Sequence, residues 1–315
     1  MRQPILNSQF SILNLIKSMR LRTLPLSLAG VVCGGLLAMG GLGRDGNWWT
    51  FVLVLLTAVF LQILSNLSNE MGDYRSGVDN ADRQGPAYGM ANGLTEKQLW
   101  RAINTMVVLC ALSGLFMLLF SFQFSIFNFQ FASLLALGAA AIWSATHYTL
   151  GKKPYGNIGL GDLFVFLFFG LVSVLGSFFV LVHDIHWYYL LPASGIGLLS
   201  VAVLNVNNIR DMQSDQGIRK TVPLRIGLRR ARWYQTVLVL LGWLLTASSY
   251  YGDTAFAWLI LCTLPLFVWH IVGVWRREGK RLDPMLPLLV MSTFLLALLY
   301  SLGVFLMLWH TTLIL

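Results

Sequence analysis

The stretch WWTFVLVLLTAVFLQILSNLSNEMGD, residues 48–73, contains an apolar run long enough to enter a lipid bilayer, followed at once by a cluster of polar residues. The whole chain of 315 residues is 57% hydrophobic and only 11% charged, and its mean hydropathy is +0.69. A soluble domain carries about 25% charged residues. The composition therefore predicts an integral membrane protein.

Crossing a bilayer takes about 20 mostly apolar residues. We expect nine such segments, which leave no room for a soluble domain. The sequence thus predicts an all-α transmembrane bundle that forms one domain over residues 1–315. A closed β-barrel would need short segments of alternating hydrophobicity, which the sequence lacks. The nine expected segments are approximately 23–42, 48–68, 99–121, 127–149, 160–182, 187–208, 232–250, 255–275 and 286–309.

The basic residues divide the connections between these segments into two groups. Of the 22 Lys and Arg residues, all but Arg44 fall in the N-terminal region or in every second connection. By the positive-inside rule, the N-terminus is cytoplasmic and, with nine spans, the C-terminus is outside. Because topology explains the net charge of +9, we expect a multi-pass protein of the cell (inner) membrane and no nucleic-acid partner. Two long cytoplasmic connections, at about 68–98 and 209–231, are expected to form the active site.

Each long connection begins with a polar cluster whose members, three or four residues apart, share a helical face. Carboxylates at this spacing repel each other unless a cation lies between them. Oxygen ligands without His or Cys favour Mg²⁺, with Mn²⁺ as an alternative, and proteins hold Mg²⁺ by one or two carboxylates plus substrate phosphates. We therefore expect a phosphorylated substrate to span two metal ions. The clusters are Asn66, Asn69, Glu70 and Asp73, and Asn208, Asp211 and Asp215.

A diphosphate also needs basic partners on the same face. Lys152 follows the fourth segment, Arg210 lies within the second cluster, and Arg22 stands at the entrance of the first segment. Tyr148 shares a helical face with Lys152, so it is placed to donate a hydrogen bond to a diphosphate oxygen or to pack beside the leaving group. Asp162 opens the fifth segment, where an acid suits both the helix dipole and a substrate role.

A membrane site suits a substrate with a long apolar tail and a diphosphate head. Metal-bound diphosphate is a good leaving group, and its departure from an allylic carbon leaves a cation that aromatic faces stabilise. The aromatic run FVFLFFG, residues 164–170, is one source of such faces. Most aromatic side chains in this chain are nevertheless expected to face lipid or the core.

These residues resemble the UbiA superfamily of intramembrane aromatic prenyltransferases, whose two motifs are Asn-Asp-x-x-Asp-x-x-x-Asp and Asp-x-x-x-Asp. Residues 69–73, NEMGD, match the first motif with Glu70 in place of Asp. Its last Asp is Gly77 here, and Asp79 stands two residues later. The second motif matches at residues 211–215, and a Tyr-x-x-x-Lys element matches at residues 148–152.

Within the superfamily, three stretches resemble the branch that prenylates 1,4-dihydroxy-2-naphthoate in menaquinone synthesis. They are RTLP at 22–25, SNLSNEMGDYRSGVDNADRQGP at 65–86 and LNVNNIRDMQSD at 204–215. The 4-hydroxybenzoate enzymes usually carry Arg-Thr-x-x-Arg-Pro after the first motif, where this chain has DRQGP at 82–86.

The resemblance implies a polyprenyl diphosphate donor, a 1,4-dihydroxy-2-naphthoate acceptor and roles for the site residues. Asn69 and Asp73 would hold one Mg²⁺, with Asn66, Glu70 or Asp79 completing the site. Asp211 and Asp215 would hold a second ion. Substrate contacts are expected from the following residues, of which the last two are equally typical of a turn: Arg22, Tyr148, Lys152, Asn208, Arg210, Asp82 and Arg83.

Two other classes of membrane protein also use clustered carboxylates. An ion-coupled transporter would place them near the middle of its spans and would show repeats related across the membrane, whereas these clusters fall on one side. A CDP-alcohol phosphotransferase would carry Asp-Gly-x-x-Ala-Arg, which is absent. The prenyl chain length and the oligomeric state leave no signal in the sequence.

Overall fold

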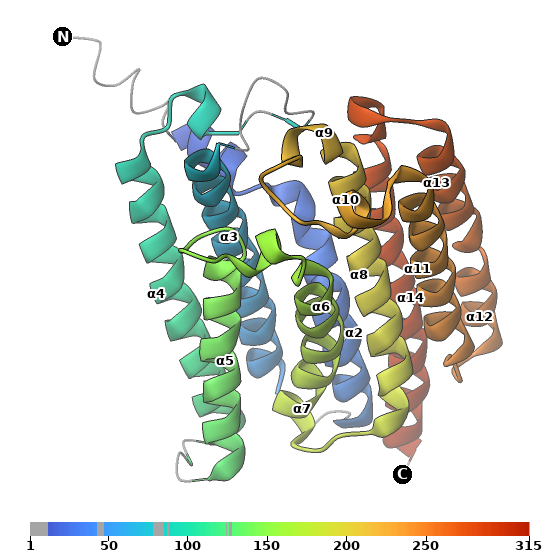
Figure 1. Ribbon diagram of the computed structural model, residues 1–315. Coiled ribbons are helices and arrows are strands. Elements are labelled where there is room, and N and C mark those ends of the chain that lie inside the picture. Colours follow the sequence, from blue (N-terminus) through green and yellow to red (C-terminus); the bar gives the residue numbers. More distant parts are fainter. Residues whose placement is uncertain are drawn as a thin grey trace.

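The computed structural model describes residues 12–42, 47–77, 85–86, 88–123, 125 and 128–314. Over these residues the chain is helical and contains no β-strand, as the sequence predicts (Figure 1). Eight of the described helices are long and apolar enough to cross a membrane. The chain is therefore an all-α, multi-pass membrane protein.

The membrane-length helices lie close to the segments expected from the sequence. The first begins at residue 12 and passes through a 3₁₀ turn, Leu21–Thr23. The fifth contains a π-helical stretch, η5, at Phe166–Gly176. The other bounds are α2 Leu24–Leu42, α3 Trp48–Ser76, α4 Glu96–Ser121, α5 Phe129–His147, α6 Gly161–Val165, α7 Ser177–Val182, α8 Leu190–Arg210, α9 Met212–Asp215, α10 Val222–Ile226, α11 Leu228–Ser248, α12 Thr254–Leu261, α13 Leu264–Arg276 and α14 Met285–Ile314.

The expected segment at 232–250 forms α11, which is not among the eight helices that meet the membrane-crossing criteria. Its first turns carry Arg229, Arg230 and Arg232, which lower its mean hydropathy. It nevertheless packs along α8 and also contacts α13. The helix is thus a full-length member of the bundle with a charged first turn.

The first acidic cluster lies on a helix and not in a connection, because α3 continues to Ser76 beyond the expected end at residue 68. Gly77 then ends α3 in the left-handed conformation, with φ 75°, and its amide bonds to the carbonyls of Asp73 and Tyr74. Glycine adopts this conformation without the steric cost that a side chain brings. Gly77 therefore acts as a helix terminator at the position where the family motif has its last Asp.

Polar side chains fix the starts of three of the membrane-length helices. Asn47 and Asn128 accept hydrogen bonds from the first-turn amides of α3 and α5. Thr95 and Gln98 form a reciprocal capping box at the start of α4. Each cap satisfies amides that would otherwise lack partners at the helix end. These caps explain where the helices begin better than hydropathy alone.

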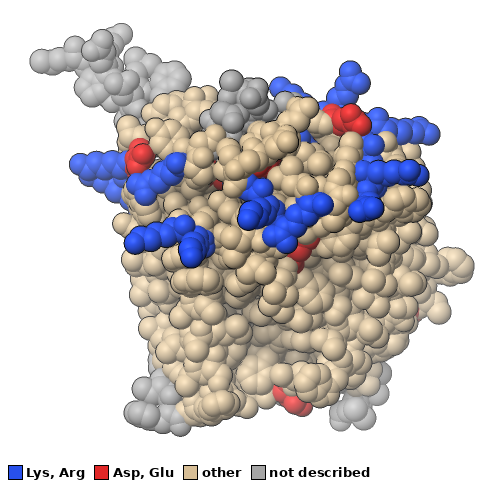
Figure 2. Space-filling view, viewed as in Figure 1, with Lys and Arg blue, Asp and Glu red and all other residues tan. Residues whose placement is uncertain are grey.

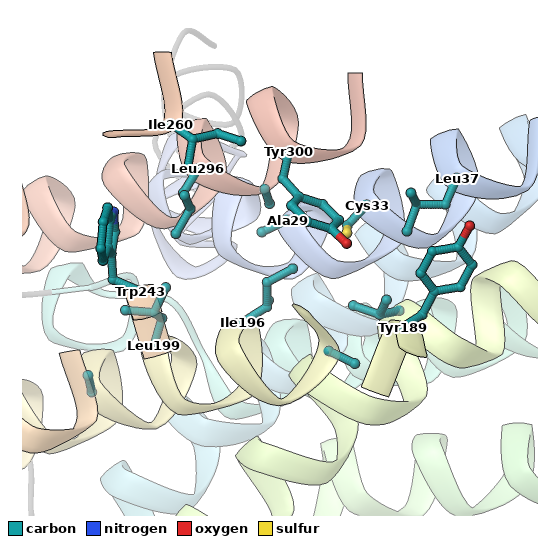
Figure 3. Packing of buried hydrophobic residues seen from close by; sticks show 14 of the residues in the cluster. Ala29, Cys33, Leu37, Tyr189, Ile196, Leu199, Trp243, Ile260, Leu296 and Tyr300 are labelled. Carbon is teal, nitrogen blue, oxygen red and sulfur yellow. The ribbon is translucent and has the colours of Figure 1, made fainter. Parts of the chain in front are cut away.

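Helices α2 and α8 form the centre of the bundle. α2 lies against α14, η5 and α3, while α8 lies against α11 and η5. In the span that contains α8, 67% of the most apolar window is buried, against 11% for α5. Small residues allow this close packing, since a Cβ on Gly170 would come within 2.6 Å of the Gly197 Cα. Figure 3 shows the core between these helices, including Ala29, Cys33, Leu37, Ile196, Leu199, Leu296 and Tyr300.

The two ends of the bundle differ in charge. The short helices α9 and α10 lie at one end, and α14 finishes at the opposite end (Figure 1). Lys and Arg side chains gather around the end with α9 and α10 (Figure 2). Both acidic clusters belong to this basic end, because they occupy the last turns of α3 and the residues after α8.

Candidate active site

A polar cavity of about 170 Å³ lies between the two acidic clusters. Its walls come from the end of α3, the turn after α5, the end of α8 and the connection that follows α8. The cavity thus brings together parts of the chain that the sequence had suggested only separately. The predicted site residues that line it are Asn66, Asn69, Asp73, Tyr148, Asn208, Arg210 and Asp211.

The two asparagines of the first cluster tie α3 to neighbouring segments. Asn66 donates to the Met19 carbonyl at 2.9 Å and to the Thr23 hydroxyl at 3.0 Å, so its amide nitrogen holds the entrance of the first span. Asn69 accepts a hydrogen bond of 3.2 Å from the Thr149 hydroxyl. Of the two, Asn69 is the more accessible, because Asn66 is buried. Asn69 is therefore better placed than Asn66 to reach a ligand.

Glu70 lies on another face of α3 and does not line the cavity. Its side chain is fully buried, and its Oε1 accepts a 2.6 Å hydrogen bond from the Met90 amide. Its other oxygen, Oε2, has no hydrogen-bond partner among the described residues. In this conformation Glu70 anchors the segment before α4.

Close approach of the turn after α5 shapes the cavity beside Asp73. A Cβ on Gly72 would lie 2.6 Å from the Thr149 carbonyl oxygen, so only glycine fits between α3 and this turn. The contact brings Tyr148 to the cavity wall. Burial raises the pKa of the Tyr148 phenol, so this side chain stays protonated near neutral pH. It can donate a hydrogen bond to an anion, and it is a poor general base.

The second cluster lies where α8 stops. α8 ends at Arg210, and the Asp211 amide closes the last turn on the Asn207 carbonyl at 3.1 Å. The Arg210 guanidinium donates hydrogen bonds to both carboxylate oxygens of Asp211, at 2.8 and 2.6 Å. It also donates to Asp283 at 2.8 Å and to the Asn207 side chain at 2.7 Å. Arg210 therefore positions Asp211 and joins α8 to the start of α14.

Arg219 connects the two clusters, a role that the sequence did not suggest. Its guanidinium forms an ion pair with Asp73 of α3, and its Nη1 lies 3.7 Å from Oδ1 of Asp215 in α9. Asp215 is only 1% exposed and does not itself line the cavity, whereas Arg219 does. Burial alone would lower the pKa of Arg219, but Asp73 and Asp215 raise it, so the side chain stays charged.

The remaining basic candidates lie differently from what the sequence suggested. Lys152 is exposed in the turn after α5 and does not line the cavity. Arg22 is also exposed and donates to the Tyr88 hydroxyl at 3.1 Å. Its neighbour Arg20 lines the cavity instead, with its guanidinium 3.9 Å from the centre of the Tyr88 ring. The Nε and Nη2 atoms of Arg20 are buried without hydrogen-bond partners in the described part of the chain.

Four further residues are candidates from the sequence. Asp79, Asp82 and Arg83 lie outside the described residues. Asp162 accepts a 2.9 Å hydrogen bond from the Tyr234 hydroxyl and does not line the cavity. Its contact ties α6 to α11, which favours a packing role for Asp162.

The oxygen donors of the cavity suit Mg²⁺, which keeps water or phosphate ligands, better than a metal ion whose ligands all come from the protein. No group of three or more His, Cys, Asp or Glu residues in the described ranges could hold a metal ion. The cavity instead offers single carboxylates from two different helix ends, Asp73 of α3 and Asp211 after α8, together with the amide oxygen of Asn69. Mg²⁺ keeps several water or phosphate ligands and binds to one or two carboxylates in this way. The site therefore suits a metal ion that arrives with an anionic ligand.

An apolar chamber of about 220 Å³ adjoins the polar cavity. The two share the wall residues Gln62, Ser65, Val165 and Phe169, so the chamber continues from the cavity into the bundle. Its walls come from α2, α3, α4, α5 and the π-helical stretch with its flanking helices. Phe164, Phe168 and Phe169 of the aromatic run face it, whereas the sequence predicts that most aromatic side chains face lipid or the core. π-Helical segments occur frequently at functional sites.

Known proteins share both the sequence and the fold of this chain. The model of the UbiA prenyltransferase family matches residues 27–291. The 1,4-dihydroxy-2-naphthoate octaprenyltransferase of Escherichia coli (strain K12) is 38% identical over 306 residues, which cover 93% of this chain and 96% of that protein. The enzyme of the same name from Haemophilus influenzae is 37% identical over 290 residues, covering 90% and 93%.

A solved structure has the same arrangement of helices. The UbiA homolog from Archaeoglobus fulgidus bound to GPP and Mg²⁺ superposes with a TM-score of 0.58, covering 90% of this chain and 99% of that one. With 16% sequence identity, this likeness shows the fold alone. The family model and the two relatives, in contrast, extend over most of the chain at the level of sequence. This chain belongs to the UbiA prenyltransferase family.

Proposed function

We propose that this enzyme transfers a polyprenyl group from polyprenyl diphosphate to 1,4-dihydroxy-2-naphthoate. The observation that carries this proposal is the joining of a polar cavity, lined by Asp73 and Asp211 from the two acidic clusters, to an apolar chamber between the spans. A prenyl diphosphate has the same two parts, an anionic head and an apolar tail. The acceptor follows from the two octaprenyltransferases that are 37–38% identical over at least 90% of the chain.

The head of the donor would bind in the polar cavity with Mg²⁺. We assign Asn69 and Asp73, which line the cavity, to one ion, and Asp211, which also lines it, together with Asp215 four residues further on, to a second. When bound, the metal neutralises the negative charge that develops on the departing diphosphate. A UbiA homolog solved with GPP and Mg²⁺ supports the choice of cation.

The chain's own donors would orient the diphosphate. Arg20 presents unpartnered guanidinium nitrogens at the cavity, and Tyr148 presents a protonated phenol. Charge-assisted hydrogen bonds of this kind are shorter and stronger than neutral ones. Lys152 and Arg22 stand outside the cavity wall, so they would assist the entry of the donor and not its ionisation.

The tail of the donor would occupy the apolar chamber. Its allylic carbon would then lie where the two cavities meet, close to Phe169 and Val165. An aromatic face stabilises a cation by its quadrupole. The chamber walls also exclude water, which would otherwise capture the cation. Breaking the allylic C–O bond here leaves the cation available to the acceptor and the electron pair on diphosphate.

The acceptor chemistry follows from an electron-rich naphthoate ring. The ring carbon that bears the carboxylate attacks the allylic cation and forms the new C–C bond. Loss of CO₂ then breaks the bond to the carboxylate, leaves its electron pair in the ring and restores aromaticity. The product is the hydroquinone form, whose two-electron oxidation to demethylmenaquinone is a separate step that this enzyme does not perform. The principal alternative acceptor for this enzyme is 4-hydroxybenzoate.

We further propose nine spans with a cytoplasmic N-terminus and active site, in the cell inner membrane of the source organism. Lys and Arg side chains gather at one end of the bundle (Figure 2), and this end carries α9 and α10 (Figure 1) and both acidic clusters. Basic residues concentrate on the cytoplasmic side of membrane proteins. Since α11 packs as a full-length helix, it would be the ninth span and would place the end of α14 outside.

One assay tests this function directly. Purified protein is incubated with farnesyl or longer prenyl diphosphates, Mg²⁺ and either 1,4-dihydroxy-2-naphthoate or 4-hydroxybenzoate. We expect a prenylated naphthalene product and one CO₂ released for each product, measured with carboxyl-labelled naphthoate. Prenylation of hydroxybenzoate alone would overturn the acceptor assignment, and no prenylation of either would reopen the transporter hypothesis.

A further inference from the structure

Arg219 occupies the position between the two acidic clusters. Its side chain is 13% exposed, and the side chains of its partners Asp73 and Asp215 are 7% and 1% exposed. Asp73 lies 146 residues away in the sequence, on a different helix. One guanidinium therefore bridges carboxylates of both clusters near the floor of the polar cavity.

The bridge contributes to the stability of the site when no ligand is bound. Carboxylates this deeply buried are costly to keep charged without a cation nearby. Arg219 supplies positive charge to a member of each cluster at once. Its contacts thus explain how the acidic clusters can be held in place before a metal ion arrives.

The same bridge conflicts with metal binding. A metal ion held by Asp73 needs an oxygen of this carboxylate, and the guanidinium already contacts Oδ1. Two cations near one carboxylate oxygen also repel each other. A metal ion on Asp73 therefore competes with Arg219 for this carboxylate and weakens the contact between the two side chains.

Arg219 is also better suited to move than the other arginine of the site. Arg210 has partners on Nε, Nη1 and Nη2, which leave its guanidinium fully engaged. The Nε of Arg219, in contrast, is buried without a hydrogen-bond partner among the described residues. A diphosphate in the cavity offers several charged oxygens, which satisfy a guanidinium more completely.

The backbone around Arg219 would remain in place during such a change. The Arg219 amide bonds to the Asp215 carbonyl at 3.0 Å, and the next amide, that of Lys220, bonds to the Asn157 carbonyl at 3.0 Å. These bonds fix the chain on both sides of the side chain. A rotation about the side-chain bonds is then enough to move the guanidinium from Asp73 towards the cavity.

We propose that Arg219 is an exchangeable counter-ion, which bridges the acidic clusters in the empty enzyme and turns onto the diphosphate when the metal and the donor bind. This inference rests on the proposed function of the cavity as a diphosphate site. It makes Arg219 a positioning residue for the donor and a competitor of the metal, two roles with opposite effects on binding.

The test measures metal and diphosphate binding separately. Arg219→Gln is compared with the wild-type enzyme and with Arg232→Gln. Arg232 is a matched control, because its side chain is also 13% exposed and its ion pair with Glu278 lies away from the cavity. Binding of Mn²⁺ without donor is followed by the paramagnetic resonance of the free ion. Binding of inorganic diphosphate in the presence of Mg²⁺ is followed by calorimetry.

We expect Arg219→Gln to bind Mn²⁺ about tenfold more tightly than the wild type, because the ion no longer competes with a guanidinium for the Asp73 carboxylate. We expect the same variant to bind diphosphate about 10- to 100-fold more weakly, the effect of losing hydrogen bonds between charged groups. Its melting temperature in EDTA should fall and recover when Mg²⁺ is added. Arg232→Gln should change neither binding constant.

Weaker binding of both Mn²⁺ and diphosphate, or no change in either affinity, would overturn the proposal. If Arg219→Gln does not fold, Arg219→Lys provides the second test, because it keeps the charge and loses the planar fork. Lysine should weaken diphosphate binding and leave Mn²⁺ binding near the wild-type value, and an unchanged diphosphate affinity would contradict the proposal. These measurements need no acceptor, so a failure of naphthoate prenylation would refute the proposed function without deciding the role of Arg219.

Discussion

The polar cavity and the apolar chamber share four wall residues and differ in almost every other respect. The polar cavity is built from short motifs at the ends of α3 and α8, and buried ion pairs fix its charged side chains. The chamber is built from single apolar residues contributed by several helices. Different parts of this enzyme therefore specify the chemistry and the selection of the donor. Changes in the cavity should affect every donor, whereas changes in the chamber should affect donors according to their length.

The largest expected effect comes from the carboxylates that line the polar cavity. Asp73→Asn and Asp211→Asn should each lower kcat by about 10²- to 10³-fold with every donor, because metal stabilisation of a leaving oxygen is worth several kcal/mol. Steady-state assays with geranyl, farnesyl and longer diphosphates measure this. Both variants should remain folded and inserted, since Arg210 retains Asp283 when Asp211 is replaced and Arg219 retains Asp215 when Asp73 is replaced.

Asp283→Asn is the matched control for Asp211→Asn. Asp283 pairs with the same arginine but does not line the cavity. We expect it to lower the melting temperature and to leave Mg²⁺-dependent turnover within a few-fold of the wild type. Equal loss of activity in both variants would show that the Arg210 cluster acts as one structural unit, and the distinction between cavity and support would fail.

The sequence revealed the polar cavity because its residues follow a spacing rule. Asp73 and Asp211 could be predicted from clusters that repeat at helical intervals behind apolar runs. The same rule also selected Glu70, whose side chain anchors the segment before α4 and does not line the cavity. Spacing identifies a helical face, and only the packing of α3 against its neighbours decides which side chains reach the cavity.

Arg20 and Arg219 could not be found in this way, because their positions depend on contacts distant in sequence. The RTLP motif directed attention to Arg22, but a left-handed residue, Arg20 with φ 48°, turns the chain so that Arg20 enters the cavity. Arg219 reaches Asp73 only through the fold of the connection after α8. The nearest sequence signal was its position four residues after Asp215.

The chamber left still less trace in the sequence. Its residues are apolar or small, as are the lipid-facing and core residues of the same helices. The aromatic run at 164–170 shows no periodicity that separates chamber-facing from lipid-facing rings, and its π-helical backbone changes the spacing of side chains that an α-helix would present. Hydropathy predicts the spans well and the space between them hardly at all.

A change in the chamber should produce the second largest effect, and one that depends on the donor. Gly138 of α5 lines the chamber, and a Cβ there would meet no atom within 4 Å. Gly138→Phe should therefore fill the chamber without disturbing the helix. We expect kcat/KM to fall about 10- to 100-fold for long donors and much less for geranyl diphosphate, since apolar pockets discriminate by this amount when they lose space.

Gly41→Phe provides the control for this variant. Gly41 is also a helical glycine with open space around its Cβ position, but it lines neither cavity. Its variant should keep the wild-type ratio between long and short donors. A uniform loss for all donors in Gly138→Phe would mean that the chamber does not hold the tail.

Tyr148 should have a moderate effect that is independent of pH. Tyr148→Phe removes one charge-assisted hydrogen bond, so kcat/KM should fall about tenfold. Burial raises the pKa of Tyr148 above the ordinary tyrosine value of about 10, so the phenol keeps its proton up to at least that pH. The ratio of wild-type to variant activity should then stay constant from about pH 6.5 to 9.5. A ratio that falls as the pH rises through this range would show that the phenol ionises and that burial does not protect it.

The smallest effect on activity is expected at Glu70, which belongs to the motif but lies outside the polar cavity. Glu70→Gln keeps a carbonyl oxygen that accepts the hydrogen bond from the Met90 amide, so the free energy of unfolding should fall by only about 1 kcal/mol. Turnover should stay within about threefold of the wild type. Thermal melts and Mg²⁺ titrations of activity measure both quantities.

Glu70→Asp separates the two possible roles, because the shorter side chain would not reach Met90 but would restore the residue of the family motif. Retained activity in the Asp variant, together with a large loss in the Gln variant, would make Glu70 a metal ligand and would extend the cavity to this face of α3. The opposite pattern, with the Asp variant the less stable of the two and both variants active, would confine the cavity to the face of α3 that carries Asn69 and Asp73.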